Sequence, residues 1–348
     1  METLWFVLVG MLLIIFVVMD GFDFGAGIIY HYIAKTNTER RIVLNAIGPI
    51  WDGNEVWLII AGGALFFAFP TAYASAFSGY YLALIMLLWL LMFRGLSMEL
   101  RSQIDNPLWR NFWDAMLFIG SLLIALILGA AIGNLVRGVP LNPDGYFFLP
   151  LWTNFGTKGD VGILDWFTVT TGVFAILVFA VHGANYLALK TQDDIQKRAQ
   201  HVSKIGLVFV TVFTFILPVA LYIARPQMLD NYQQFPIGLV FPLLAFSSLI
   251  ASFIYRRKNA DLEAFMASAL LIVFLMLSAT FTMYPNILIA TTDPKNSLTI
   301  YNSATSEYAL ATGIKWFVVG FSLALFYTFH MYRSFRGKAK IPEGGQGY

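Results

Sequence analysis

Long stretches of mostly apolar residues recur along the chain and constrain its fold more than any other feature. We locate nine, at roughly 4–30, 52–69, 72–93, 114–136, 162–189, 203–224, 236–255, 262–284 and 309–332. A helix of about 20 apolar residues spans a bilayer, and only helices or closed barrels satisfy their backbone groups there. Charged residues make up only 12% of the chain. The sequence therefore predicts an all-α membrane protein with nine transmembrane helices.

The lysines and arginines between these stretches predict an orientation. Most of them fall in every second connecting segment, beginning with the one after the first span, and in the C-terminal tail. Such residues collect in cytoplasmic segments. We therefore expect the N-terminus outside and the C-terminus in the cytoplasm. In this scheme Arg94, Glu99 and Arg101 lie in a solvated cytoplasmic loop after the third span.

An internal echo predicts two related halves. The segment Asp20-Gly-Phe-Asp23-Phe24 matches His182-Gly-Ala-Asn185-Tyr186 at an offset of 162 residues. Duplication of a four-helix unit explains the match and gives both copies the same orientation. We therefore expect a first four-helix bundle with the acidic motifs (1–136), a second four-helix bundle (162–284), and a ninth helix with a basic cytoplasmic tail (309–348).

Two acidic clusters lie within or beside the first two predicted spans. Asp20 and Asp23 stand three residues apart, on one face of a helix. A charge at the bilayer centre costs roughly 2.5 to 3.5 kcal/mol on insertion scales, so such groups are commonly functional. The alternative for Asp23 is a helix-end acid that pairs with Arg40 or Arg41. Gly21 and Gly25 form a G-x-x-x-G pair that permits close helix packing.

The second cluster is Trp51-Asp52-Gly-Asn-Glu55, followed by Trp57. Asp52 as an N-cap with Glu55 at position N3 is typical of a capping box. Capping does not account for the density of polar groups between two tryptophans, and a functional role is favoured. Both roles can coexist in one helix start. Asp114 and Asp165, at two other predicted helix starts, are interpreted as caps.

The sequence offers few ligands for a metal or haem. It contains no cysteine and only four histidines, three of them near predicted helix ends. His182 lies inside a span and is the one candidate haem ligand, although an isolated buried histidine is more often a hydrogen-bonding core residue. No phosphate-binding loop or spaced metal-ligand cluster occurs. We expect no metal site and no nucleic-acid partner.

Several motifs in order resemble subunit II of cytochrome bd ubiquinol oxidase. Motif density is highest over about 1–140, and length and predicted topology agree over the whole chain. The motifs are Asp20-Gly-Phe-Asp-Phe-Gly-Ala-Gly27, Thr38-Glu-Arg-Arg-Ile42, Trp51-Asp-Gly-Asn-Glu-Val-Trp57, Ala61-Gly-Gly-Ala-Leu-Phe66, Phe93-Arg-Gly, Glu99-Leu-Arg101, Trp109-Arg-Asn-Phe-Trp-Asp114, Gly133-Asn134 and Gly138-Val-Pro140.

The resemblance implies a role in respiration. Such a subunit pairs with the haem-bearing subunit I in a bacterial inner membrane. The complex oxidises quinol, reduces dioxygen to water, and generates proton-motive force without pumping. Haems b and d are expected in the partner, no cofactor is expected to bind this chain tightly on its own, and a structural quinone is found in some members. A small single-helix subunit and membrane lipids are further expected partners.

The resemblance also assigns roles to particular residues. It implies a proton path from the cytoplasm at Asp52, with Asp23 as a further candidate near the entrance. The two acids beside them, Asp20 and Glu55, complete the predicted path. It places Trp57 near a dioxygen route, and Trp51 and Trp57 are candidates for that route or for a subunit contact. Two other hypotheses fit intramembrane acids. One is a proton-coupled secondary transporter. The other is a purely structural scaffold subunit whose acids join helices.

Overall fold

The computed structural model describes residues 1–340, which are mostly helical. Predicted tail residues 341–348 lie outside the described part. The elements are α1 (Glu2–Met19), α2 (Gly21–Ile33), α3 (Asn37–Ile47), α4 (Trp51–Ala68), α5 (Pro70–Gly79), α6 (Tyr81–Leu100), α7 (Pro107–Arg137), α8 (Trp166–Lys190), α9 (Asp193–Ala224), η1 (Pro226–Leu229), α10 (Asp230–Gln234), η2 (Pro236–Leu239), α11 (Val240–Arg257), α12 (Asp261–Met283), β1 (Asn286–Leu288), η3 (Pro294–Asn296), β2 (Leu298–Thr299) and α13 (Glu307–Ser334).

Eight helical segments within the described residues are long and apolar enough to cross a membrane, and α1 with α2 counts as one of them. The predicted second span corresponds to α4, which is not among the eight. Its first turns carry Asp52, Asn54 and Glu55, which lower its mean hydropathy. α4 nevertheless packs against α1 inside the bundle. The count of nine spans and their orientation remain predictions.

The third predicted span is displaced along the sequence. We expected 72–93, but α5 ends at Gly79 and α6 continues from Tyr81 to Leu100. Tyr80 lies between the two helices in a non-helical conformation. Arg94 is therefore a helical residue, and Arg94 and Arg101 are buried. The predicted solvated loop at these arginines is wrong, because acidic side chains on neighbouring helices pair with both.

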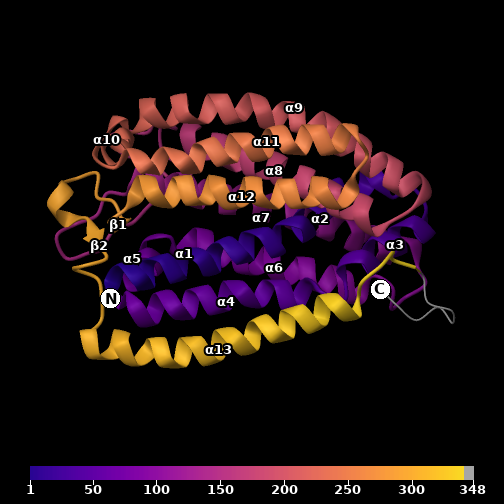
Figure 1. Cartoon of the computed structure of the whole chain (residues 1–348), viewed down its shortest axis with the longest axis horizontal. Helices are drawn as coiled ribbons and strands as arrows, with labels where there is room; N and C mark the ends of the chain where they lie inside the picture. The colour runs from indigo at the N-terminus through magenta and orange to yellow at the C-terminus, as the bar shows by residue number, and fades with distance from the viewer. Residues whose placement is uncertain (341–348) are drawn as a thin grey trace.

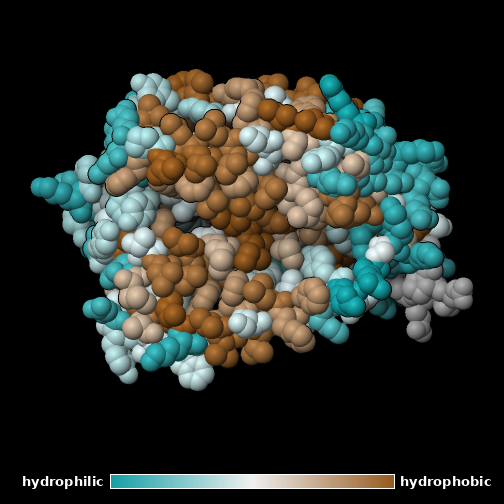
Figure 2. All heavy atoms as spheres, in the orientation of Figure 1, coloured by the Kyte–Doolittle hydropathy of each residue, from teal (hydrophilic) through white to brown (hydrophobic). Residues whose placement is uncertain are grey.

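The long helices lie side by side and carry short elements at the two ends of the bundle (Figure 1). α3 and the C-terminal segment 335–340 lie at one end, called here the α3 end. α5, α10 and the two-stranded antiparallel sheet of β1 and β2 lie at the other, the strand end. Apolar side chains form a broad band between ends that are richer in polar residues (Figure 2). This distribution suits a bundle inserted in a membrane.

α3 is an amphipathic helix with a capping box formed by Thr36 and Glu39. Burial raises the pKa of Glu39, but hydrogen bonds from Arg198 and from the backbone of Lys35 and Thr36 outweigh it, so the pKa lies below its usual value. Glu39 is therefore charged at neutral pH. Its ion pair with Arg198 joins α3 to α9 at the α3 end.

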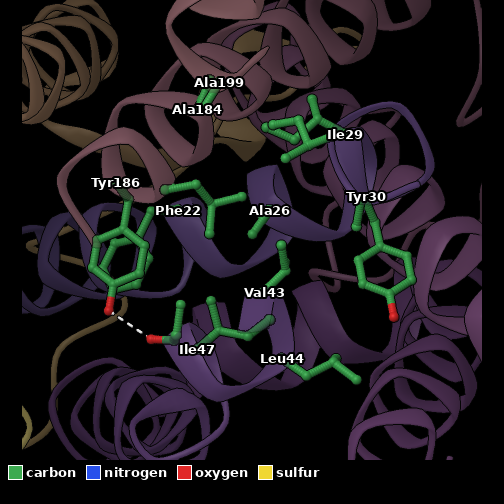
Figure 3. Close-up of a cluster of buried hydrophobic side chains, with 14 of the residues drawn as sticks. Phe22, Ala26, Ile29, Tyr30, Val43, Leu44, Ile47, Ala184, Tyr186 and Ala199 are labelled. Carbon is green, nitrogen blue, oxygen red and sulfur yellow. Dashed lines mark hydrogen bonds between the residues drawn. The ribbon is translucent and has the colours of Figure 1, made fainter. Parts of the chain in front are cut away.

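Glycine allows α2 and α8 to cross at very short range. A Cβ on Gly25 would lie 1.8 Å from the carbonyl oxygen of Phe179, and one on Gly183 would lie 2.4 Å from the backbone nitrogen of Ala26. The expected close packing at Gly25 is confirmed. Around this crossing, apolar side chains from α2, α3, α8 and α9 form a buried cluster (Figure 3).

At the strand end, Arg137 of α7 fixes the start of α8. Its guanidinium pairs with Asp165 and donates to the carbonyl oxygen of Gly162 (3.1 Å). Asp165 also accepts from the backbone of Phe167 and Thr168, which confirms the predicted cap. The loop between α7 and α8 is therefore anchored at both of its ends.

The structure adds a detail to the predicted duplication. The offset of 162 residues that relates Asp23 to Asn185 also relates Arg94 of α6 to Arg256 of α11. Arg94 Nη2 lies 3.8 Å from Asp23 Oδ2, and Arg256 Nη1 donates to Asn185 Oδ1 at 3.4 Å. In each half, the arginine thus lies near the residue that the internal echo aligns, which is Asp23 of α2 in the first half and Asn185 of α8 in the second. The division into two four-helix bundles remains a prediction.

Candidate functional site

The guanidinium of Arg94 is the centre of a buried polar cluster. Arg94 and Asp20 are both fully buried. Arg94 Nη2 donates to Asp20 Oδ1 at 2.6 Å, and Nη1 donates to Asp20 Oδ2 at 3.2 Å. This two-pronged geometry is the strongest form of an arginine–carboxylate pair. Arg94 was not predicted from the sequence as a site residue.

Two further carboxylates face the same guanidinium. Asp23 Oδ2 lies 3.8 Å from Nη2, and Glu55 Oε2 lies 3.5 Å from Nη1. We call Asp20, Asp23, Glu55 and Arg94 the acid cluster. With all three acids ionised, the cluster would carry two uncompensated negative charges in a poorly solvated interior, which is costly. The arrangement therefore favours proton binding within the cluster. Asp23 Oδ1 accepts no hydrogen bond from a described residue and is free to carry that proton.

The amide of Asn54 connects Asp23 to the end of α13. Asn54 Nδ2 donates to Asp23 Oδ2 at 2.7 Å, and Tyr332 Oη donates to Asn54 Oδ1 at 2.8 Å. Asn54 is fully buried, whereas Tyr332 is half-buried. The chain of contacts thus runs from the acid cluster toward the α3 end of the protein.

The position of Asp20 follows from a break between helices. α1 ends at Met19 and α2 begins at Gly21, so Asp20 stands at their junction. His182 Nε2 is hydrogen-bonded to the carbonyl oxygen of Val18 at 3.1 Å, immediately before the break. Two aromatic rings lie near the guanidinium: Arg94 Cζ is 4.5 Å from the Phe24 ring centre and 5.9 Å from that of Trp51. Cation–π contact compensates part of the cost of burying the charge.

The structure places the predicted site residues at different depths. Asp20 and Asp23 are fully buried, the Glu55 side chain is 22% exposed, and Asp52 is exposed. Asp52 forms no ion pair with another described residue. It therefore lies outside the acid cluster and one helical turn from Glu55.

The capping interpretation of Asp52 and Glu55 is wrong. α4 begins at Trp51, its N-cap is Ile50, and no side chain caps it. The alternative for Asp23, a pairing with Arg40 or Arg41, is also not found among the described ion pairs. Arg40 instead pairs with Asp114, and Asp23 faces Arg94. Asp23 and Glu55 face the guanidinium of Arg94, which comes from the distant helix α6.

The two predicted tryptophans lie on α4, the helix that carries Glu55 of the acid cluster. Trp57 is almost fully buried and meets Phe321 of α13 edge-on, with ring centres 6.0 Å apart. Trp51 is half-buried and packs against Gly95, where a Cβ would lie 3.0 Å from the indole. Their roles on a dioxygen route or in a subunit contact remain predictions.

A second buried polar cluster surrounds Asp114 of α7. The carboxylate accepts from Tyr30 Oη (2.7 Å), Arg40 Nη1 (2.7 Å) and Arg101 Nε (2.5 Å). Asp114 therefore joins α2, α3 and α6 to α7. It lies inside α7, which begins at Pro107 with Asn106 as its cap. The prediction that Asp114 caps a helix is wrong.

His182 has both of its ring nitrogens in hydrogen bonds. Nδ1 lies 2.8 Å from Ser268 Oγ, Nε2 contacts Val18, and the ring stacks on Phe265. This geometry suits a structural core histidine, and a haem iron would have to displace one of the two bonds. Among residues 1–340, no group of three or more acidic or histidine side chains could hold a metal ion.

The comparisons with known proteins identify the family. The family model for cytochrome bd terminal oxidase subunit II matches residues 1–335. The chain belongs to this family. It is 36% identical to the probable cytochrome oxidase subunit 2 of Haemophilus influenzae and 34% identical to the cytochrome bd-I ubiquinol oxidase subunit 2 of Escherichia coli K12. In both cases 97% of this chain and 95% of the relative are covered.

The fold agrees with this family. A chain in the structure of bd oxidase from Geobacillus thermodenitrificans superposes with a TM-score of 0.75 at 18% identity, covering 96% of this chain and 98% of that one. The cytochrome bd ubiquinol oxidase subunit 2 of Bacillus subtilis is 31% identical over 94% of this chain. The predicted resemblance is confirmed, and so is a multi-pass protein of the bacterial inner membrane.

Proposed function

We propose that this chain is the non-haem subunit of a quinol:oxygen oxidoreductase. It stabilises the haem-bearing subunit I and supplies part of the proton path to the oxygen-reduction site. The acid cluster is the observation that supports a proton path, because three carboxylates share one guanidinium in the protein interior. Such a group can bind and release a proton with little change in structure. Because the protons are consumed in the reaction, the complex would generate proton-motive force without pumping.

The path we propose follows a gradient of burial. A proton from the cytoplasm first meets the exposed Asp52, then the partly exposed Glu55, then the buried Asp23 and Asp20. Asp52 serves as a collecting group at the surface, while the buried acids hold the proton inside. Neighbouring carboxylates exchange protons readily because each charge disfavours ionisation of the next.

The partner would bind where α4, α6 and α13 leave their apolar residues exposed. Ile59 of α4, Leu88 of α6 and Phe326 of α13 are each at least 61% exposed. A Cβ added at Gly62 or Gly63 of α4 would meet no atom within 4 Å, so a partner helix can approach the backbone there. Glu55 belongs to the same helix, which brings this surface close to the acid cluster.

Haems b and d would be held by subunit I, where they supply the electron transfer to dioxygen. The hydrogen bonds at both ring nitrogens of His182, the candidate haem ligand inside a span, support this placement. This chain would instead position carboxylates and exclude lipid from them. A small single-helix subunit and lipids complete the expected partners, and Trp57 on a dioxygen route belongs to the same proposal.

A spectrum of the purified complex tests the assignment. A tagged form of this chain, extracted in mild detergent, should bring down a second polypeptide and show haem b and haem d bands in a reduced-minus-oxidised spectrum. The His182→Ala variant should keep these bands in proportion to the partner. Absence of haem from the complex would contradict the oxidase proposal. Haem bound to this chain alone, and lost in His182→Ala, would contradict the placement in the partner.

We also propose a structural quinone in the second half of the chain. A cavity of about 530 Å³ lies between α7, α8, α9, α11 and α12, and its walls are almost entirely apolar. This volume lies within the range of typical ligand pockets. An isoprenoid tail would fill the apolar part. Tyr232 and Thr282, which line one region and contact each other at 3.4 Å, offer hydroxyl groups to a quinone head.

The quinone content of the purified complex tests directly whether this cavity holds a quinone. Organic extraction of the purified complex should release about one quinone that survives extensive washing, and Ala279→Trp, which fills the cavity, should abolish it. Ile223→Trp is the matched control, because Ile223 is exposed on α9. Equal quinone content in both variants would rule out this cavity as the site.

A further inference from the structure

We propose that Tyr332 is a positioning residue that sets the amide orientation of Asn54 and thereby the proton affinity of Asp23. This inference rests on the proposed proton path. It adds a residue from the far end of the chain to a site that otherwise comes from α1, α2, α4 and α6. It is supported by a pair of hydrogen bonds, by the packing that holds Tyr332, and by the donor and acceptor capacities of the three side chains.

Two hydrogen bonds fix the orientation of the Asn54 amide. Tyr332 Oη lies 2.8 Å from Asn54 Oδ1, and Asn54 Nδ2 lies 2.7 Å from Asp23 Oδ2. An ionised carboxylate only accepts hydrogen bonds, so Asn54 must present its NH₂ group to Asp23. The carbonyl of the same amide then points at Tyr332, which donates to it. The tyrosine thus stabilises the orientation that supports an ionised Asp23.

The reverse orientation suits the protonated acid. A protonated Asp23 can donate to Asn54 Oδ1, and the rotated NH₂ group can then donate to the tyrosine oxygen. A hydroxyl accepts as well as donates, so Tyr332 satisfies Asn54 in both states. Phenylalanine satisfies it in neither. The amide therefore responds to proton binding at Asp23, and Tyr332 determines how strongly the ionised state is preferred.

Packing holds Tyr332 in place. A Cβ on Gly53 would lie 2.7 Å from Met331 Sδ, so the glycine lets the end of α13 approach α4. Beyond α13 the chain is tied to α8: Lys338 Nζ donates to the carbonyl oxygen of Thr191 (2.7 Å), and Lys190 Nζ donates to that of Phe335 (2.6 Å). These contacts account for a glycine beside Asn54 and hold segment 335–340 against the end of α8.

Several charged or titratable groups surround Asp23 and share its proton equilibrium. They come from the α1–α2 junction, α4, α6, α8 and α13, and are Asp20, Glu55, Arg94, Tyr186 and Tyr332. Tyr186 donates its hydroxyl to the carbonyl oxygen of Ala46 at 2.9 Å, the dashed line in Figure 3. Its proton is committed elsewhere, so Tyr332 is the tyrosine that acts through Asn54.

An infrared titration of the resting complex tests the proposal without relying on turnover. The carboxyl signal of Asp23 is identified by its loss in Asp23→Asn. In Tyr332→Phe its midpoint should move to higher pH by about half a unit to one unit, because a weakened hydrogen bond stabilises the carboxylate less. Tyr327→Phe removes an exposed hydroxyl from the same helix and should leave the midpoint unchanged.

A double-mutant cycle separates positioning from a general structural effect. Asn54→Leu removes the donor to Asp23 and should shift the midpoint upward by itself. Adding Tyr332→Phe to Asn54→Leu should then produce no further shift, since the tyrosine acts through the amide. An unchanged midpoint in Tyr332→Phe, or an equal shift with and without Asn54, would overturn the proposal. Unchanged oxygen uptake in Asp23→Asn would instead overturn the proton path, whatever the titration shows.

Discussion

Replacing Arg94 by leucine is expected to destabilise the protein by about 3 to 5 kcal/mol, the usual cost of removing one partner from a buried ion pair. The substitution removes the one guanidinium that faces Asp20, Asp23 and Glu55. The acids would then repel one another or take up protons from solution, and either outcome costs folding free energy. We expect a lower thermal unfolding midpoint of the purified complex and partial loss of haem.

Two variants give this experiment its controls. Arg94→Lys keeps the charge but cannot form the two parallel bonds to Asp20, so its midpoint should fall between those of the wild type and Arg94→Leu. Arg257→Leu removes an exposed arginine from the end of α11 and should have little effect. Equal stability of Arg94→Leu and Arg257→Leu would contradict the place of Arg94 at the centre of the acid cluster.

Replacing Asp23 by asparagine is expected to lower quinol-driven oxygen uptake by at least about a hundredfold, the lower range for loss of a positioned proton-transfer group. Asparagine has nearly the same size and still accepts a hydrogen bond, but it cannot hold a proton. The fold and the haem spectrum should therefore be retained. The expected defect is in turnover, measured with an oxygen electrode on the assembled complex.

Asp52→Asn is the matched comparison in this assay. Because Asp52 is exposed, water can deliver protons to Glu55 without it, and we expect less than about a threefold loss. A large defect in Asp52→Asn together with a normal Asp23→Asn would reverse the proposed order of the path. If either variant fails to assemble, the haem-to-protein ratio reveals it before the oxygen assay is interpreted.

Local sequence patterns predicted the helices and much of the acidic site. Burial of Asp20 and close packing at Gly25 follow from their positions inside an apolar stretch. The family was also recognisable, because several short motifs occur in order. These features depend on residues that lie near each other in the chain.

Contacts between distant segments were not predictable in the same way. Arg94 follows an apolar stretch, and its charge suggested a loop, whereas its guanidinium lies 2.6 Å from Asp20 at the α1–α2 junction. Asp114 resembled a cap but binds two arginines from other elements. Tyr332 lies 278 residues from Asn54 along the chain. The sequence did offer one signal for Arg94. An arginine recurs at position 256, at the same offset that relates Asp20 to His182 in the internal echo.

Proton uptake during dioxygen reduction tests the central claim most directly. The fully reduced complex would be mixed with dioxygen while a pH-indicator dye follows the protons taken from solution. We predict that Asp23→Asn slows this uptake by at least about a hundredfold, while haem reduction by quinol stays normal and Asp52→Asn remains close to wild type. Proton uptake at the wild-type rate in Asp23→Asn would contradict a proton path through the acid cluster.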